Sequence, residues 1–127
     1  MNMLVDTQSF IWFCDGDKKL PNNIKDIMNN KENNLKLSIA SLWEITIKMS
    51  IEKLVLSWGI AEIIDLALKN GFDILPIKAQ HLISLSSLEF IHKDPFDRMM
   101  IAQCIAEKVP MISSDGIFKE YPIQVIW

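Results

Sequence analysis

A chain of 127 residues, 50% hydrophobic and 23% charged, has the length and composition of one globular domain, residues 1–127, rather than two. Its net charge of −3 excludes a general attraction to phosphates, so a nucleic-acid partner would need a local basic patch or metal ions. No uncharged run approaches the ~20 apolar residues that span a bilayer. Two isolated cysteines and the lack of a signal-peptide pattern favour a cytoplasmic protein that does not contact membranes.

Short apolar runs alternate with amphipathic segments in the first half of the chain. Met3-Leu4-Val5 predicts a buried strand, and Asp6 after it suits the N-cap of a helix. Pro21 stands where a second helix begins. The elements expected here are a strand at 3–5, helices at 8–14 and 21–30, a strand at 35–39 and a helix at 40–49.

Glu44 lies in the expected helix 40–49, whose other residues are mostly apolar, which predicts a central, buried helix. Glu44 could complete a capping box with Ser41, or pair with Lys48 one turn later. A carboxylate buried in such surroundings needs a partner or a metal ion. Glu44 is therefore also a candidate functional residue.

The second half of the chain continues the alternation. Residues 53–59 form a loop or brief strand whose large apolar side chains either pack in the core or present a surface to a partner. His81 and His92 are isolated, which favours surface or hydrogen-bonded histidines over metal ligands. The elements expected here are helices at 60–69, 78–88 and 95–108, strands within 72–77 and at 110–115 and 123–127, and a helical turn from 115.

The stretch His92–Gln103 has a pronounced helix start. Asp94 is a suitable N-cap and Pro95 a suitable first helical residue. Asp97 adds a second carboxylate in the first turn. It either favours the helix dipole or forms one wall of a metal site.

Alternating strands and helices predict an α/β fold with a parallel sheet and helices on both faces. Active sites in such folds lie beyond the carboxyl ends of the strands. Asp6 and Asp115 follow strands, and Glu44 and Asp97 lie near helix starts that face the same edge. Four carboxylates together repel one another unless a cation joins them, and an all-oxygen site favours Mg²⁺ or Mn²⁺ over zinc. Water activated by such an ion can attack a phosphodiester.

Other chemistries lack their motifs. The chain has no GxGxxG and no GxxxxGK[ST] sequence, which argues against a glycine-rich nucleotide loop. It has no GxSxG sequence, and neither histidine has an obvious nucleophile partner.

Several segments resemble the PIN domain and, more narrowly, the VapC-like toxins of bacterial toxin–antitoxin pairs. The resemblance covers essentially the whole chain, in the right order. Its most specific parts are the Leu-Trp-Glu-Ile and Asp-Pro-Phe-Asp-Arg sequences. The segments are Leu4–Thr7, Ser38–Ile45, Lys53-Leu54, Leu75–Ile77, Asp94–Gln103 and Ile112–Asp115.

The resemblance implies a PIN-like fold and a Mg²⁺- or Mn²⁺-dependent endoribonuclease that hydrolyses RNA and is inhibited by a cognate antitoxin. The family's acidic positions fall on Asp6, Glu44, Asp97 and Asp115. Asp6 and Asp97 would bind the metal, while Glu44 and Asp115 would orient waters or hold a second ion. Ser113 fits a family position two residues before the last acid. Homodimers are usual in the family.

Two questions stay open on the sequence alone. The same fold could instead be a non-catalytic module that binds RNA or protein. Asp94 is a helix cap, a site residue, or both. The basic residues that either contact phosphates or are solvated surface charges are Lys48, Lys53, Lys93 and Arg98.

Overall fold

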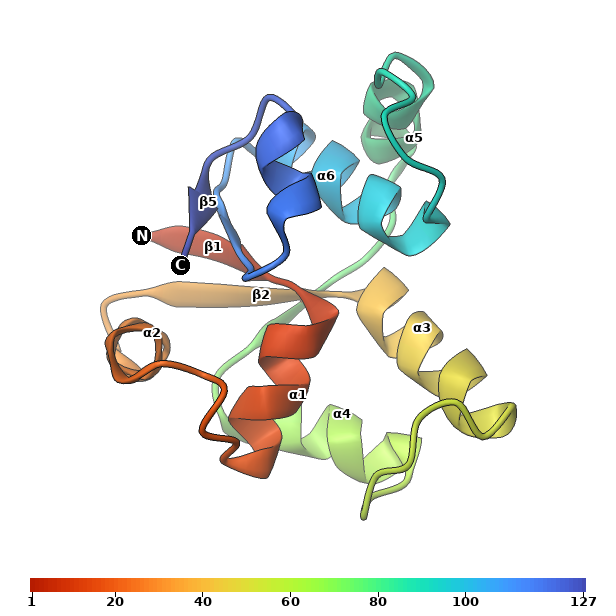
Figure 1. Ribbon diagram of the computed structural model, residues 1–127. Helices are drawn as coiled ribbons and strands as arrows, with labels where there is room; N and C mark the ends of the chain where they lie inside the picture. Colours follow the sequence, from red (N-terminus) through yellow and green to blue (C-terminus); the bar gives the residue numbers. More distant parts are fainter.

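Five parallel strands form one sheet in the order β3-β2-β1-β4-β5. The computed structural model describes all 127 residues. The predicted α/β fold, a central parallel sheet with helices on both faces, is confirmed (Figure 1). The strands are β1 (Asn2–Val5), β2 (Asn34–Ser38), β3 (Asp73–Leu75), β4 (Met111–Ile112) and β5 (Val125–Ile126).

The predicted helices are all present, with ends that differ by a few residues. The segment 53–59 is irregular, so the brief strand considered for it is wrong. None of the helices is both long and apolar enough to cross a bilayer. The helices are α1 (Thr7–Asp15), α2 (Asn22–Asn29), α3 (Ile39–Ser50), α4 (Ile60–Lys69), α5 (Ala79–Ser86), α6 (Pro95–Glu107) and the 3₁₀ helix η1 (Gly116–Glu120).

The central strand β1 supplies both hydrophobic cores, because successive side chains of a strand point to opposite faces. Met3 and Val5 join the core under α1, α2 and α4, together with Phe10 and Ile63. Leu4 joins the core under α6 and η1. Burial on both faces explains why β1 is a continuous apolar run.

Helix α3 differs from its prediction in two ways. The prediction that α3 is buried on all sides is wrong: Leu42 and Ile45 are buried, but Trp43 is 58% exposed, with its ring edge to face against Phe96 at 5.3 Å between ring centres. The capping box is also wrong, because Ser38 caps the helix by accepting a hydrogen bond from the Ala40 amide at 3.0 Å. Glu44 therefore lies in the second turn of α3 rather than at its start.

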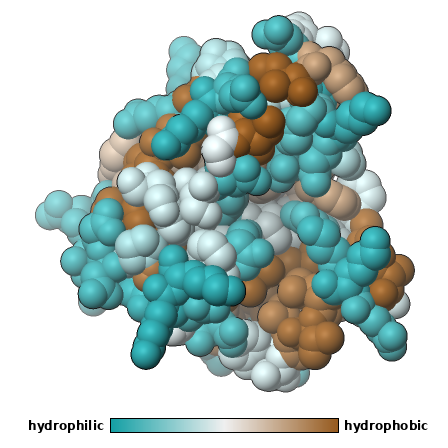
Figure 2. Space-filling model, in the orientation of Figure 1, coloured by the Kyte–Doolittle hydropathy of each residue, from teal (hydrophilic) through white to brown (hydrophobic).

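The apolar segment between α3 and α4 is mostly a packing element. Leu54, Leu56 and Trp58 pack against the core that includes Met3 and Val5. Val55 is 88% exposed. Figure 2 shows an apolar area at the lower right, over α4 and this loop. Core packing, one of the two readings of the sequence, therefore accounts for three of these side chains.

Candidate active site

A cavity of about 500 Å³ opens at the carboxyl ends of the central strands. It lies where the connections from β1 and from β4 leave in opposite directions along the sheet, which is where ligands bind in open α/β folds. In Figure 1 the starts of α1, α3 and α6 surround this region. All four predicted site residues line the cavity, and Asp94 lines it as well: Asp6, Glu44, Asp97 and Asp115 are thus brought together.

The register of β1 and β4 places Asp6. Val5 pairs with Ile112, so the next residues, Asp6 and Ser113, lie side by side at the edge of the sheet. One carboxylate oxygen of Asp6, Oδ1, accepts a hydrogen bond from the Ser9 amide at 2.8 Å and so caps α1. The other, Oδ2, accepts one from Ser113 Oγ at 2.5 Å. Asp6 is therefore both a helix cap and a cavity residue.

Burial destabilises the negative charge of Asp6. Asp6 is only 5% exposed, and burial raises the pKa of its carboxyl above the ordinary 3.8. The hydrogen bonds from Ser113 and Ser9 act against this rise in pKa, and the charge of Asp115 adds to it. A cation at this position would favour the charged form.

Glu44 projects from α3 into the same cavity and is only 6% exposed. Its Oε1 accepts a hydrogen bond from the Thr7 hydroxyl at 2.8 Å, and its Oε2 lies 2.6 Å from the Lys48 ammonium. The predicted pairing with Lys48 is confirmed. The pKa of Lys48 is raised, first by the hydrogen bond to Glu44 and also by the charges of Asp94 and Asp97. Lys48 is thus a cation on the wall of an acidic cavity.

Asp97 lies in the first turn of α6, held by two neighbours. Asp94 caps the helix by accepting a hydrogen bond from the Asp97 amide at 2.9 Å, as predicted. Oδ2 of Asp97 lies 3.2 Å from His92 Nε2. Burial, and then the charges of Asp94 and Glu44, raise the pKa of Asp97 to about 6, although the bond from His92 opposes this. The carboxylates therefore repel one another, as the sequence predicted.

Asp115 is exposed at the rim of the cavity. Its Oδ1 accepts a hydrogen bond from the Ile117 amide at 3.1 Å and caps η1. Its own amide donates to Ser113 Oγ at 3.0 Å. Ser113 therefore connects Asp115 with Asp6, so two acidic residues from different segments share one hydroxyl.

The carboxylates do not form a closed metal cage. No group of three or more His, Cys, Asp or Glu side chains is arranged to hold a metal ion. Protein donors occupy both oxygens of Asp6 and of Glu44, while Oδ1 of Asp97 accepts no hydrogen bond from the protein. Mg²⁺ usually binds through one or two carboxylates and keeps several waters, so it needs no such cage. The donor set, all oxygen and negatively charged, fits a hard divalent cation.

The basic residues considered for phosphate contacts lie in different places. Lys48 and Lys53 line the cavity. Lys93 is exposed and does not line it. Arg98 is only 7% exposed and donates to main-chain oxygens and to the Tyr121 hydroxyl. Both readings of Arg98, as a phosphate contact and as a solvated charge, are therefore wrong.

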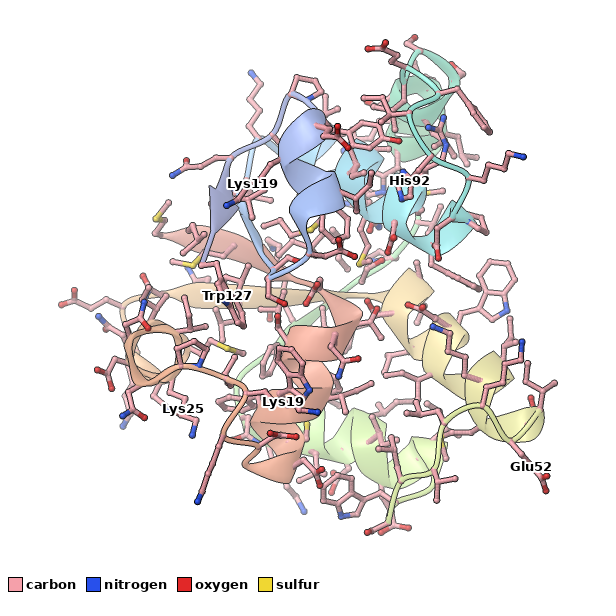
Figure 3. All side chains as sticks on the ribbon, in the orientation of Figure 1. Lys19, Lys25, Glu52, His92, Lys119 and Trp127 are labelled. Atoms are coloured by element: carbon pink, nitrogen blue, oxygen red, sulfur yellow. The ribbon has the colours of Figure 1, made fainter.

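The two histidines are hydrogen-bonded, as expected of isolated histidines. His81 is fully buried between α5 and α6, where its Nε2 lies 2.8 Å from Glu107 Oε2 and its Nδ1 accepts from the Lys78 amide. His92 is partly exposed and lies between η1 and the start of α6 (Figure 3). It does not line the cavity but contacts Asp97, which does.

Sequence reasoning missed three residues that hold the cavity carboxylates. Thr7 bonds to Glu44, and His92 and Tyr121 form a chain that ends at Asp97. Thr7 follows Asp6 directly, so its position at the mouth of the cavity was a usable signal. Tyr121 carries no such signal, since it is far from Asp97 in the sequence.

Several solved structures share this fold. The chain resembles one from the VapBC2 complex of Rickettsia felis bound to promoter DNA, at 16% identity over 99% of this chain and 98% of that one, with a TM-score of 0.75. It is equally similar to a chain of the DNA-bound VapBC complex of Salmonella typhimurium, at 16% identity over 99% and 97%, with a TM-score of 0.75. The PIN domain endonuclease Utp24 matches at 20% identity over 94% and 74%, with a TM-score of 0.53.

Sequence comparison gives the family. No curated protein matches the chain. The model of the PIN domain family matches residues 3–124, nearly the whole chain. The cavity lies where the resemblance to this family had located the acidic positions. The chain therefore belongs to the PIN domain family.

Proposed function

We propose that the chain, acting over residues 1–127 as one PIN-like domain, is a Mg²⁺- or Mn²⁺-dependent endoribonuclease of a toxin–antitoxin pair. The observation that carries this proposal is the convergence of Asp6, Glu44, Asp97 and Asp115 on one cavity at the carboxyl edge of the sheet. Membership of the PIN domain family and the likeness to the fold of VapBC chains and of the endonuclease Utp24 support it.

The electrostatics of the cavity favour a cation. Asp6 and Asp97 both have raised pKa values, in each case partly because another carboxylate lies close by. Repulsion of this kind costs stability when the groups are ionised, and a divalent cation removes that cost. The ammonium of Lys48 offsets only one of the negative charges. The cavity thus keeps an excess of negative charge that suits a divalent ion.

In this proposal Asp6 and Asp97 hold the ion. When bound, the ion supplies charge stabilisation for the phosphate and lowers the pKa of water. Ser9 and Ser113 fix the two oxygens of Asp6, and Thr7 orients Glu44. Glu44 and Asp115 then orient water for the attack, or hold a second ion.

The substrate must bring phosphates to a cavity whose own charge is negative. Lys48 and Lys53 are the only basic residues that line it. We assign them to the phosphates that flank the bond to be cut, because ammonium groups bind phosphate as compact point charges. RNA is the polymer that the resemblance to VapC-like toxins implies.

The test is a cleavage assay with the purified chain. A panel of structured and unstructured RNAs is incubated with Mg²⁺ or Mn²⁺, and then with EDTA. We expect metal-dependent cutting by the wild type and by Asp65→Asn, a matched control on the exposed face of α4. We expect none by Asp6→Asn. Tight RNA binding that needs no metal and gives no cleavage by any variant would instead support a non-catalytic binding module.

A protein partner forms the second part of the proposal. Another structure with this fold is a toxin–antitoxin complex from Klebsiella pneumoniae, and we propose that an antitoxin inhibits this chain and that the chain forms a homodimer. Co-expression with a candidate antitoxin, followed by size-exclusion chromatography with light scattering, tests both. A complex that does not cleave RNA is expected. A fully active monomer in the presence of that protein would contradict this part alone.

A further inference from the structure

Three polar side chains form a hydrogen-bonded chain that ends at Asp97. Arg98 Nη1 lies 3.2 Å from the Tyr121 hydroxyl, which lies 2.7 Å from His92 Nδ1. His92 Nε2 in turn lies 3.2 Å from Asp97 Oδ2. In Figure 3 His92 lies between η1, whose end is followed by Tyr121, and the start of α6.

The Tyr121 hydroxyl determines which nitrogen of His92 carries the proton. This oxygen also lies 3.1 Å from the main-chain amide of His92. The amide and the Arg98 guanidinium can only donate hydrogen bonds, so the Tyr121 oxygen accepts from both. Its single O–H is then left to donate to His92 Nδ1. With Nδ1 as an acceptor, the neutral ring carries its proton on Nε2 and donates it to Asp97 Oδ2.

Arg98 anchors the end of this hydrogen-bond network that lies farthest from Asp97. Its side chain is 7% exposed, and Nη1 donates to the main-chain oxygen of Glu89 at 2.9 Å. The guanidinium also lies over the Phe90 ring, 4.3 Å from its centre. Tyr121 itself is 3% exposed. A hydrogen-bond network held by buried groups at one end can fix the orientation of a partly exposed carboxylate, here that of Asp97, at the other.

A purely structural role would be satisfied by any partner for His92. The partner is instead the one carboxylate of α6 that lines the cavity together with Glu44. Asp94 holds the main chain of Asp97, and His92 holds one oxygen of its side chain. The second oxygen, Oδ1, is left without a hydrogen bond from the protein. A carboxylate prepared in this way has one oxygen fixed and one available to a cation.

We infer that His92 and Tyr121 are positioning residues for Asp97, which fix its carboxylate so that Oδ1 is presented to a divalent cation. The inference rests on the proposed function. Outer partners of this kind orient metal ligands, and their loss commonly costs about 10- to 100-fold in metal affinity or activity. Neither residue lines the cavity, so neither is expected to contact RNA.

The first experiment reads the tautomer of His92 without metal or RNA. The chain has two histidines, so labelling with ring-¹⁵N histidine gives a ¹⁵N spectrum that contains only the signals of their ring nitrogens. In EDTA, under conditions where the ring signals are those of neutral imidazole, we expect both rings to carry the proton on Nε2. Tyr121→Phe should change the His92 signals and leave those of His81 unchanged, because His81 belongs to a separate network.

The second experiment measures Mn²⁺ affinity by calorimetry and RNA cleavage by steady-state kinetics. Tyr121→Phe should weaken Mn²⁺ binding about 10-fold or more and lower kcat, with KM for RNA nearly unchanged. His92→Gln, which keeps an N–H donor near Nε2, should retain more affinity than His92→Leu. Gln80→Ala, which removes a surface partner of Glu107, serves as the control and should match the wild type.

The outcomes separate this inference from the proposed function. A wild-type His92 with its proton on Nδ1, or a Tyr121→Phe variant with unchanged Mn²⁺ affinity, would overturn the inference alone. A wild type that binds no Mn²⁺ and cuts no RNA would overturn the proposed function and the inference together. If Tyr121→Phe does not fold, the comparison of His92→Gln with His92→Leu decides, and equal affinities in these two overturn the inference.

Discussion

Asp97 and Glu107, at opposite ends of α6, each lie within hydrogen-bond distance of a histidine Nε2. The distance is 3.2 Å from His92 to Asp97 and 2.8 Å from His81 to Glu107. The pKa of Glu107 is lowered, mainly by the bond from His81. The pKa of Asp97 is raised to about 6, mainly by burial and then by the charges of Asp94 and Glu44. A carboxylate paired with a histidine therefore has a lowered pKa at one end of α6 and a raised pKa at the other.

A histidine partner therefore does not by itself identify a functional carboxylate. The surroundings of the pair make the difference. Glu107 has Gln80 and Lys78 as further partners, and both stabilise its negative charge. Its bond with His81 connects α6 with α5. Asp97 has other carboxylates as neighbours, on the wall of a cavity. Groups whose pKa values are strongly perturbed in a cleft are candidates for chemistry, whereas a satisfied pair between two helices is structural.

The largest expected difference between the two pairs is in RNA cleavage. Asp97→Asn removes a proposed metal ligand and should lower kcat by more than about 100-fold, beyond what loss of an outer partner costs. Glu107→Gln keeps an acceptor for His81 and should cleave at the wild-type rate. Single-turnover cleavage at saturating Mn²⁺ measures both. Equal losses in the two variants would remove the distinction between the pairs.

The second difference is in the free energy of unfolding, where the substitution of Glu107 should have the larger effect. Glu107→Ala leaves the N–H of the fully buried His81 without its partner, which should lower the free energy of unfolding by about 1–3 kcal/mol. Asp97→Asn should not destabilise the chain at neutral pH, because it removes a repelled charge. Urea denaturation in EDTA gives both values. A Glu107→Ala variant as stable as the wild type would show that this pair contributes nothing.

The pH dependence of stability should differ in sign between the pairs. Folding raises the pKa of Asp97 from 3.8 to about 6, so its ionisation costs stability as the pH rises through that range. Folding lowers the pKa of Glu107, so its charge stabilises the fold above its ordinary pKa of 4.5 and ceases to do so as the pH falls.

Melting temperatures in EDTA between about pH 4 and pH 7 test this contrast. The advantage of Asp97→Asn over the wild type should be absent near pH 4 and complete above about pH 6. The deficit of Glu107→Gln should be largest near neutral pH and should shrink below about pH 4.5. Parallel pH profiles for the two variants would contradict the opposite pKa shifts.

The smallest expected effect concerns Lys48, whose ammonium lies 2.6 Å from Glu44 and near Asp97. Lys48→Met removes a cation that competes with a metal ion for the same negative charge. We expect Mn²⁺ to bind up to about fivefold more tightly, in line with the energy of a partly exposed ion pair. Calorimetric titration measures this. Weaker binding in Lys48→Met would mean that Lys48 orders Glu44 for the metal rather than competing with it.

The fold could be predicted largely because its signals are local. The apolar run before Asp6 identifies β1, and Asp94 with Pro95 identifies the start of α6. The convergence of Asp6 and Asp115 follows from the parallel register of β1 and β4, which the alternation of elements already favoured. The burial of α3 could not be predicted, since composition alone does not reveal that Trp43 faces solvent.

The support of the site could be predicted only in part. The pairing of Glu44 with Lys48 follows from helix geometry, because residues four apart are neighbours. The hydrogen bond from Tyr121 to His92 joins residues that are 29 positions apart in the sequence and depends on how η1 packs against α6. No local sequence pattern therefore predicts it. The sequence also does not show that Arg98 is buried. Arg98, adjacent to Asp97, could therefore be interpreted as a phosphate-binding residue.

Binding of a divalent cation by the cavity carboxylates underlies both the proposed function and the role assigned to His92 and Tyr121. Anomalous diffraction from crystals of this chain soaked in millimolar Mn²⁺ tests it most directly. We expect an anomalous peak coordinated by Asp6 and Asp97, and we expect this peak to be absent from Asp97→Asn crystals. A fully ordered cavity without such a peak, or Mn²⁺ bound elsewhere and equally in both proteins, would contradict it.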